Sequence, residues 1–548
     1  RLGEYINTSH PEFLVNKIYF DAYKKDVSGG LATYPDVKTN IQKQLKNGLL
    51  LINYTGHGST TAWSDERVLT ESDITQSTYT RLPIWITATC DFCRFDASVT
   101  SAGEQVFLNK VSGGIGLFTT TRVAYSTPNF EINDNLIRNL FEKKNGRRLT
   151  LGEVMKATKR ALGSSRYKLG FALIGDPALK LAYPEYRMQV TAVNGNPVTD
   201  DPVDFKALQK ITVEGEVLNA DGNVATDFSG LLNPTVLDSR VSYETLDNNK
   251  TGNTFKYTDY SNILFIGNDS VRAGKFSFTF TVPKDISYSN EFGKMNLYAS
   301  DETNNLEAQG AYLNYRVGGT DDNAEDDHDG PEIRVLYMND STFVNGGQVN
   351  TTPFFVARLW DKSGVNITGS SIGHDMMLII DGDPSLSFNL NSYYELIPGK
   401  DGEGIVKYLL PALTPGIHTA EFKVWDIQNN STTYEFEFEV VEGLKPYLLE
   451  LTATPSPARE QVEFHLFHNR PESQLTVGIM VYDMMGRLQW KHQETGASEL
   501  FKSYTVTWDL TNNRGGRLRP GIYIYRAAIS SGGSKEATDA KKLIILAQ

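Results

Sequence analysis

The sequence predicts a multidomain protein in which an α/β domain is followed by three antiparallel β-sandwich domains. At 548 residues the chain is too long for a single hydrophobic core. Residues 1–184 alternate continuous apolar runs with amphipathic segments, a pattern typical of a parallel sheet covered by helices. After Pro184 the helical pattern stops, and short segments of alternating polarity follow, separated by Asn, Gly and Asp turns.

The α/β domain is predicted from four apolar runs that have the character of strands buried on both faces. These runs are NKIYFDAY (16–23), GLLLINYT (48–55), LPIWITAT (82–89) and GGIGLFTTT (113–121). The amphipathic segments expected to form helices are residues 36–47, 101–112 and 129–146. Because the first strand comes so early, we expect other strands of this sheet to precede residue 1. Residues 1–184 would then be only part of the complete α/β domain, a half-domain.

The three β-rich regions are predicted at residues 185–330, 331–443 and 444–548. The first ends in the linker GGTDDNAEDDHDGPE (318–332), which carries seven carboxylates from Asp321 to Glu332. Such a run is typical of a solvated linker. Structural calcium is the alternative, because hard oxygen ligands are abundant here, although no EF-hand spacing is present.

Composition excludes several classes of protein. The formal net charge of −13 and the pI near 5.3 argue against a nucleic-acid partner, which needs a basic face. No apolar run approaches the roughly 20 residues of a membrane-spanning helix. The chain does not begin with Met, so the lack of a signal peptide says nothing about localisation. The two cysteines, Cys90 and Cys93, exclude a disulfide scaffold.

His57 and Cys90 each follow a predicted buried strand, and the chain between them is long enough for a parallel crossover. Reacting groups in open α/β sheets lie beyond the carboxyl ends of the strands. A thiolate can attack a peptide carbonyl while an imidazole removes the thiol proton or protonates the leaving amine. We therefore predict a Cys-His proteolytic centre, with the backbone N–H groups of Gly58 and Cys90 as oxyanion donors.

The Cys90-Asp-Phe-Cys93 motif has two other interpretations, half of a zinc site or a redox dithiol. Zinc is disfavoured because no further cysteine exists and His57 alone does not complete a tetrahedron. A redox pair would also follow a strand, but it gives no role to the Gly-His-Gly turn. We expect Cys93 to be a small residue packed against the site.

Around these residues the sequence resembles the gingipain family of cysteine peptidases. The resemblance is carried by INYTGHGSTTAW (52–63) and LIGDPAL (173–179) and extends over residues 1–184. It implies a caspase-like α/β fold in which a strand ending in His-Gly is followed by a strand ending in Cys. The family's His and Cys fall on His57 and Cys90.

Further segments depart from the secreted gingipains and resemble the signal peptidase/sortase members of the family, which serve the type IX secretion system of Bacteroidetes. They are WSDERVLTESDI (63–74), TATCDFCRFDASVTSAGEQ (87–105) and TTTRVAYS (119–126). The sortase pattern usually has a small residue where Cys93 stands, which supports Cys90 as the nucleophile. The last region resembles the C-terminal signal β-sandwich of type IX cargo, through TATPSPARE, VYDMMGRLQW, VTWDL, RPGIYIYR and KKLIIL.

The sortase resemblance implies a surface enzyme of a Gram-negative outer membrane. It would cleave the C-terminal signal domain from cargo proteins, hold the cargo as a thioester on Cys90 and transfer it to the amine of anionic lipopolysaccharide. The implied partners are the cargo, the lipopolysaccharide and a PorV-like outer-membrane β-barrel shuttle protein. The chemistry itself requires no cofactor.

Residues near the nucleophile are candidates for the substrate pocket. Tyr125 falls near an aromatic that lines the pocket in the gingipain pattern, and core packing is the alternative. Asp91, Arg94 and Asp96 lie beside Cys90, where a structural ion pair or a loop cap is the alternative to contact with substrate. The acidic residues that orient the His in gingipain-type domains would precede residue 1, apart from Glu4, so the missing N-terminal part of the domain is an expected partner.

Two other functions remain open on the sequence alone. A gingipain-type endopeptidase would hydrolyse the thioester and digest external proteins, sharing the first half of the reaction. A surface adhesin or scaffold would use its β-domains on an inactive catalytic fold. The presence of both His57 and Cys90 argues against the second alternative.

Overall fold

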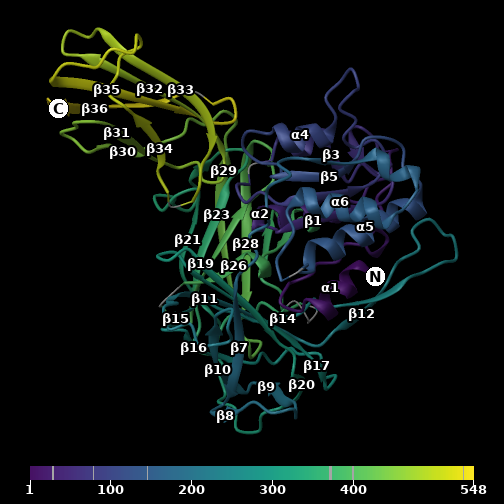
Figure 1. The fold of residues 1–548 in the computed structure, drawn as a ribbon. Helices are drawn as coiled ribbons and strands as arrows, with labels where there is room; N and C mark the ends of the chain where they lie inside the picture. The colour runs from purple at the N-terminus through teal and green to yellow at the C-terminus, as the bar shows by residue number, and fades with distance from the viewer. Residues whose placement is uncertain are drawn as a thin grey trace.

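The computed structural model describes residues 1–27, 30–77, 79–144, 146–368, 373–397, 400, 402–500, 502–534 and 536–547. In Figure 1 the β-rich regions, coloured teal, green and yellow, follow one another along the molecule, and the blue α/β part lies against their side. Among the described residues, no helix combines the length and the apolar character needed to cross a membrane.

The α/β domain is built on a four-stranded sheet of order β1-β4-β5-β6. Its strands are β1 (Leu51–Thr55), β4 (Ile84–Ala88), β5 (Gly116–Thr120) and β6 (Phe171–Ile174). The pairs β1–β4 and β4–β5 are parallel, as the apolar runs predict, whereas β6 pairs with β5 in the antiparallel direction. Every residue of β4 and β5 is buried, which explains why these strands have no alternation of polarity.

Helices cover both faces of this sheet. The helices are α1 (Leu2–Ser9), α2 (Pro35–Asn47), α3 (Glu71–Thr75), α4 (Ala102–Leu108), α5 (Ser126–Phe141) and α6 (Leu151–Ala161), with short 3₁₀ turns η1 (Phe20–Ala22) and η2 (Arg166–Gly170). Trp85 of β4 packs with α2 and α4 on one face, and its neighbours Ile84 and Ile86 pack with α5 and α6 on the other. A small hairpin of β2 (Ala62–Trp63) and β3 (Leu69–Thr70) lies in the β1–β4 crossover.

The prediction of a strand at residues 16–23 is wrong. The segment is an irregular stretch that ends in η1. Its aromatic side chains have partners far along the chain, because the Tyr19 ring packs edge-on against Tyr257 with centroids 4.6 Å apart. Its backbone does the same, since the Lys17 N–H donates to the Asp259 carboxylate at 3.3 Å. The apolar content therefore serves an interface with the first β-rich region and not the sheet.

The first β-rich region differs from a simple two-sheet sandwich. Its nine-stranded sheet has the order β10-β16-β15-β11-β18-β19-β7-β8, and β14 pairs with β11. Because β7 pairs with β19 and also with β10, the sheet closes on itself. The strands of the region, including those of two smaller sheets, are β7 (Tyr186–Val193), β8 (Asn196–Pro197), β9 (Val203–Ala207), β10 (Lys210–Leu218), β11 (Gly230–Leu237), β12 (Val241–Glu244), β13 (Lys256–Asp259), β14 (Ile263–Ile266), β15 (Asp269–Arg272), β16 (Lys275–Thr281), β17 (Glu291–Phe292), β18 (Lys294–Asp301), β19 (Leu306–Tyr312) and β20 (Tyr315–Thr320).

The second β-rich region has two sheets that contribute side chains to one core. One has the order β21-β23-β27-β26 and the other β22-β29-β28-β24-β25. Its elements are β21 (Glu332–Met338), β22 (Gln348–Val349), β23 (Phe354–Trp360), β24 (Met377–Ile380), η3 (Pro384–Leu386), β25 (Ser387–Asn389), η4 (Asn391–Tyr393), β26 (Tyr394–Leu396), β27 (Glu403–Leu409), β28 (Gly416–Trp425) and β29 (Ser431–Val440).

The third β-rich region repeats this plan with sheets of order β30-β31-β34 and β33-β32-β35-β36 around a separate core. Its strands are β30 (Leu448–Thr454), β31 (Val462–His468), β32 (Gln474–Asp483), β33 (Leu488–Ala497), β34 (Tyr504–Trp508), β35 (Gly521–Ser530) and β36 (Ala537–Ile545). Inward-facing residues alternate with outward-facing residues along β32, as the period of a half-buried strand requires.

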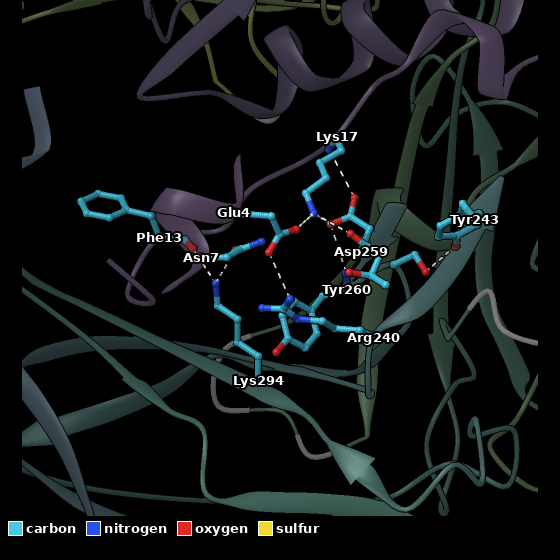
Figure 2. Close-up of polar contacts among 11 residues, drawn as sticks. Glu4, Asn7, Phe13, Lys17, Arg240, Tyr243, Asp259, Tyr260 and Lys294 are labelled. Atoms are coloured by element: carbon cyan, nitrogen blue, oxygen red, sulfur yellow. Dashed lines mark hydrogen bonds and ion pairs between the residues drawn. The ribbon is translucent and has the colours of Figure 1, made fainter. Parts of the chain in front are cut away.

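A buried polar network joins the α/β domain to the first β-rich region (Figure 2). Glu4 of α1 forms ion pairs with Lys17 and with Arg240, the latter at 3.1 Å. The Lys294 ammonium donates to the Phe13 carbonyl at 2.7 Å and to the Asn7 side chain at 3.2 Å. These contacts fix the relative position of two parts of the chain that are more than 200 residues apart in sequence.

Candidate active site

Neighbouring parallel strands bring His57 and Cys90 to the same edge of the sheet. In the β1–β4 register Thr55 pairs with Ala88, so each functional residue stands two positions beyond a paired residue. The Gly56 N–H donates to the Ala88 carbonyl at 3.4 Å and extends the pairing into the turn. We call this place the His57–Cys90 edge. The parallel adjacency predicted from the sequence is confirmed.

The two turns at this edge touch each other through Gly58 and Thr89. A Cβ atom on Gly58 would overlap the Thr89 side-chain oxygen and would lie 3.2 Å from the Ala62 carbonyl. Only glycine lets the residue after His57 lie directly against the residue before Cys90. This close approach is the structural reason for the Gly-His-Gly sequence.

Two backbone N–H groups at the edge are free to bind an oxyanion. The bridge between Gly58 and Trp63 is closed by bonds from the N–H groups of Ser59 and Ser64. Within the described part of the chain, neither the Gly58 N–H nor the Cys90 N–H has an acceptor. Unpaired donors beside a nucleophile are the arrangement that stabilises a developing oxyanion.

The Cys90 thiol lies half-buried against the loop between β5 and α5. Its Sγ donates to the Ala124 carbonyl and accepts from the Ala124 N–H, both at 3.4 Å. Asp91 follows with a φ of +52°, and its N–H donates to the Arg122 carbonyl at 3.3 Å. The chain thus turns sharply after Cys90, and the neighbouring loop holds that turn. Asp91 therefore forms part of a turn. A structural role in this loop is the alternative to substrate contact that the sequence leaves open.

The His57 side chain is exposed, and its ring has no hydrogen-bond or ion-pair partner among the residues that the structure describes. Its backbone carbonyl, in contrast, accepts from the Tyr54 hydroxyl at 2.6 Å and from the Ser64 N–H at 2.8 Å. The imidazole is therefore free to exchange a proton, while its main chain is held in place.

Cys93 is completely buried and packs against α4. A Cβ on Gly103 would lie 2.6 Å from the Cys93 Cβ, so the contact is tight. Burial, together with the negative charge of Glu104, raises the pKa of the Cys93 thiol to about 11. Both cysteines are free thiols. A thiol that stays protonated is a poor nucleophile, which fits the predicted packing role.

Arg94 and Asp96 lie on the surface beside the nucleophile. Asp96 forms an ion pair with Arg122 at 2.6 Å and a longer one with Arg94 at 3.7 Å. Hydrogen bonds from Arg122 hold the pKa of Asp96 below its usual value. These residues connect the loop after Cys90 to the loop after β5. Arg94 is thus part of an ion pair, the structural alternative to substrate contact.

A cavity of about 390 Å³ opens beside the thiol, and Tyr125 lines it. One of its lining residues is Ala124, whose backbone contacts Cys90 Sγ. The Tyr125 ring packs edge-on against Tyr167 with centroids 5.3 Å apart, and Asn129 is buried with its Oδ1 unpaired in the described structure. Besides these residues, the cavity is lined by Thr120, Arg122, Val123, Pro128, Ile132, Arg166, Leu169, Gly170 and Phe171.

Sequence reasoning missed most of this lining. Arg166 and Tyr167 belong to η2, which precedes the antiparallel strand β6, an element that was not expected. Asn129 lies in a segment for which the sequence predicts a helix and no functional role. The LIGDPAL segment (173–179) begins in the last residues of β6 and gives no signal for the turn before that strand. Glu4 lies in the network of Figure 2, with its carboxylate bound to Lys17 and Arg240 and not to His57.

Three carboxylates, one from the acidic linker and two from the second β-rich region, could hold a metal ion. Ligand atoms of Asp327, Asp361 and Asp426 lie within 4.8 Å of one another. Burial raises the pKa of both Asp361 and Asp426. Asp327 belongs to the acidic linker, and its carbonyl accepts from the Asn430 side chain at 2.9 Å. Part of the linker is therefore docked on the turn between β28 and β29 and is not simply solvated.

Comparisons with known proteins address the first third of the chain most directly. Residues 1–182 match the model of Peptidase family C25. The dimeric latent PorU of Porphyromonas gingivalis is 35% identical over 79% of this chain and 41% of its own, with a TM-score of 0.34. The Arg-specific cysteine proteinase gingipain R (RgpB) is 21% identical over 51% of this chain and 56% of its own, with a TM-score of 0.26.

A complex of the pro- and mature domains of RgpB from Porphyromonas gingivalis gives the same identity and coverage of this chain, and 57% of its own chain is covered. No curated protein sequence matches. The chain thus spans 41% of the PorU chain and slightly more than half of the gingipain chains that it resembles.

Proposed function

With residues 1–182 forming a cysteine-peptidase domain of peptidase family C25, we propose that this protein removes the C-terminal signal domain of type IX secretion cargo and transfers the cargo to anionic lipopolysaccharide. Cys90 would be the nucleophile and His57 the base and acid. The observation that carries the proposal is the register of β1 and β4, in which both residues stand two positions beyond a paired residue.

The first half of the reaction forms a thioester. His57 takes the proton from Cys90 Sγ, and the thiolate attacks the scissile carbonyl carbon. The oxyanion that forms accepts hydrogen bonds from the N–H groups of Gly58 and Cys90. The C–N bond then breaks, and the imidazolium gives its proton to the leaving amine of the signal domain. The cargo remains as an acyl group on sulfur.

The second half transfers the acyl group. An amine of the lipopolysaccharide attacks the thioester carbonyl, His57 accepts a proton from that amine, and the C–S bond breaks. An amide forms and the thiolate is released. The thioester must survive water until the amine arrives. The cavity lined by Tyr125 lies next to the thiol and is the proposed site for the cargo residue that supplies the acyl group.

Hydrolysis and transfer share the same dyad, so the dyad does not distinguish them. The sortase role is supported instead by the resemblance of the segments around Cys90 and at the end of the chain to the sortase members of the family. The alternative is a gingipain-type hydrolase. In this proposal residues 444–548 dock on a PorV-like shuttle protein, which would hold the enzyme at the cell surface. The second alternative, an adhesin on an inactive fold, predicts that Cys90 is dispensable.

The deciding experiment incubates purified protein with a peptide that spans a cargo–signal junction, with and without a competing primary amine. We expect amide product to grow with amine concentration, and Cys90→Ala to abolish both cleavage and transfer. The matched control is Cys93→Ser, which removes the other thiol and should retain activity. Hydrolysis alone at high amine concentration would reject transfer, and full activity of Cys90→Ala would reject the peptidase.

We also propose that structural calcium, the alternative to a purely solvated acidic linker, binds between Asp327, Asp361 and Asp426. The support is the burial of two like charges without a Lys, Arg or His ion pair in the described structure. The test compares the Tm of the wild-type protein and of Asp361→Asn in calcium and in EDTA. A calcium-dependent rise confined to the wild type supports the site, and equal Tm values in both buffers contradict it.

A further inference from the structure

The His57 imidazole has no hydrogen-bond or ion-pair partner among the described residues, so its orientation depends on how its backbone is held. The carbonyl of His57 receives two hydrogen bonds, of which the shorter comes from the Tyr54 hydroxyl at 2.6 Å. This bond runs from Tyr54, the last residue but one of β1, to His57, the second residue after the strand. It ties the turn to the sheet.

The bond requires the glycine between the two residues. A Cβ on Gly56 would lie 2.6 Å from the Tyr54 hydroxyl oxygen and 2.9 Å from the carbon that bears it. Any side chain at this position would push the phenol away from the His57 carbonyl. Gly56 therefore makes room for the Tyr54 bond, as Gly58 makes room for Thr89.

The Tyr54 ring is itself fixed in an aromatic stack. It is 7% exposed and lies parallel to Trp63, with centroids 4.4 Å apart and planes 10° apart. Trp63 in turn packs against Phe92, two residues beyond Cys90, at 5.9 Å. Burial raises the pKa of the Tyr54 hydroxyl well above its usual value, so it remains a donor across the physiological range. One rigid aromatic core thus lies beneath both turns.

We propose that Tyr54 is a positioning residue of the catalytic centre, which holds the His57 main chain so that the imidazole and the Gly58 N–H both face the substrate carbonyl on Cys90. The inference rests on the proposed Cys-His function. Tyr54 acts through the His57 carbonyl and contacts neither substrate nor thiol. Loss of its hydroxyl should lower the rate of the chemical step and leave substrate binding unchanged, because the cavity is built from other residues.

The test is Tyr54→Phe, with Tyr79→Phe as the matched control. Tyr79 is similarly buried in the same core, but its hydroxyl donates to the Gly113 carbonyl at 2.8 Å and not to the backbone of either turn at the His57–Cys90 edge. We expect Tyr54→Phe to lower kcat about tenfold with KM changed less than twofold, since misplaced catalytic groups cost rate and not affinity. Tyr79→Phe should lose comparable stability and keep kcat.

A second readout is the rate at which iodoacetamide alkylates Cys90 at neutral pH, measured in a Cys93→Ser background. We expect a decrease for His57→Ala and a smaller decrease for Tyr54→Phe. Equal kcat and alkylation rate for the two tyrosine variants would overturn the positioning role while His57→Ala remains inactive. If His57→Ala itself keeps both activity and alkylation rate, the Cys-His function fails instead.

Discussion

The His57–Cys90 edge lies within the α/β domain, whereas the polar network of Figure 2 joins that domain to the first β-rich region, and the two places differ in how their polar side chains are paired. At the edge, the His57 ring is exposed and two backbone N–H groups have no acceptor among the described residues. In the network, Lys294 is 1% exposed and both of its hydrogen-bond partners belong to the other region. The imidazole and the N–H groups proposed to take part in the reaction have no hydrogen-bond partner among the described residues. The groups that join the two regions have hydrogen-bond or ion-pair partners.

The difference separates activity from stability. A free imidazole contributes nothing measurable to folding, so its removal should affect only chemistry. A buried ammonium has lost its water, and removal of its partners leaves an uncompensated charge. Each of the following variants either tests this separation or measures its limits.

The largest effect is expected for His57→Ala. Peptide cleavage should fall by about 1,000-fold or more, as for loss of a general base in related chemistry. The Tm should stay within the error of a thermal scan, because the ring has no partner among the described residues. A parallel loss of Tm and activity would mean that the edge is structural, and the comparison would break.

Lys17→Met should show the reverse behaviour. The Lys17 side chain is 6% exposed and pairs with Glu4 and, at 3.9 Å, with Asp259. Removing it leaves the buried Asp259 carboxylate without an ion-pair partner among the described residues, at a cost of about 3 kcal/mol in the free energy of unfolding. Urea denaturation, followed by fluorescence of the α/β domain, measures this cost. Below the transition, kcat should equal that of the wild type.

Lys294 should give the network a pH dependence. Burial, helped by the charge of Arg240, lowers the pKa of Lys294 from 10.5 to about 8. Between about pH 8 and 10.5 the unfolded chain binds more protons than the folded chain, so the free energy of unfolding should rise with pH. The full rise attributable to this group is about 3 kcal/mol.

Lys294→Met provides the reference for that measurement, because tyrosines also titrate in this range. The difference in unfolding free energy between wild type and variant should increase from about pH 8 to 10.5 and be flat below pH 7. A difference that is independent of pH would show that Lys294 is not desolvated in solution.

The smallest effect is expected for Tyr125→Ala. The ring is 62% exposed and packs against Tyr167, so its removal should leave the Tm unchanged. If it contacts the cargo residue in the cavity, KM should rise by about two- to tenfold, the size of one lost aromatic contact. Steady-state kinetics with the junction peptide measure this, and an unchanged KM would remove Tyr125 from the pocket.

The sequence was sufficient to predict that His57 and Cys90 follow neighbouring parallel strands, because these elements are local and strongly patterned. Strands β4 and β5 are buried on both faces, so each is a continuous apolar run that ends at a functional residue or loop. Residues 16–23 carry the same apolar signal, but they pack against Tyr257 and bond to Asp259, partners that no local pattern reveals.

The cavity could not be predicted for a related reason. It combines Tyr125 with Arg166 and Tyr167, and these meet only because β6 pairs antiparallel to β5. Closure of the first β-rich sheet through β7 and β10 was equally hidden, since alternation along a strand gives its faces and not its neighbours. Both the cavity and the closure of this sheet depend on strand pairing between residues far apart in the sequence, which the sequence pattern does not reveal.

The pairing of Thr55 with Ala88 also constrains how such a chain can vary during evolution. Side chains alternate between the two faces of a strand, so a single insertion or deletion between Ile84 and Cys90 would turn the thiol to the opposite side of the sheet. The crossover between Ser64 and Pro83 carries no such restriction. Changes in length should therefore accumulate in that crossover, and the two residues before each functional side chain should be intolerant of them.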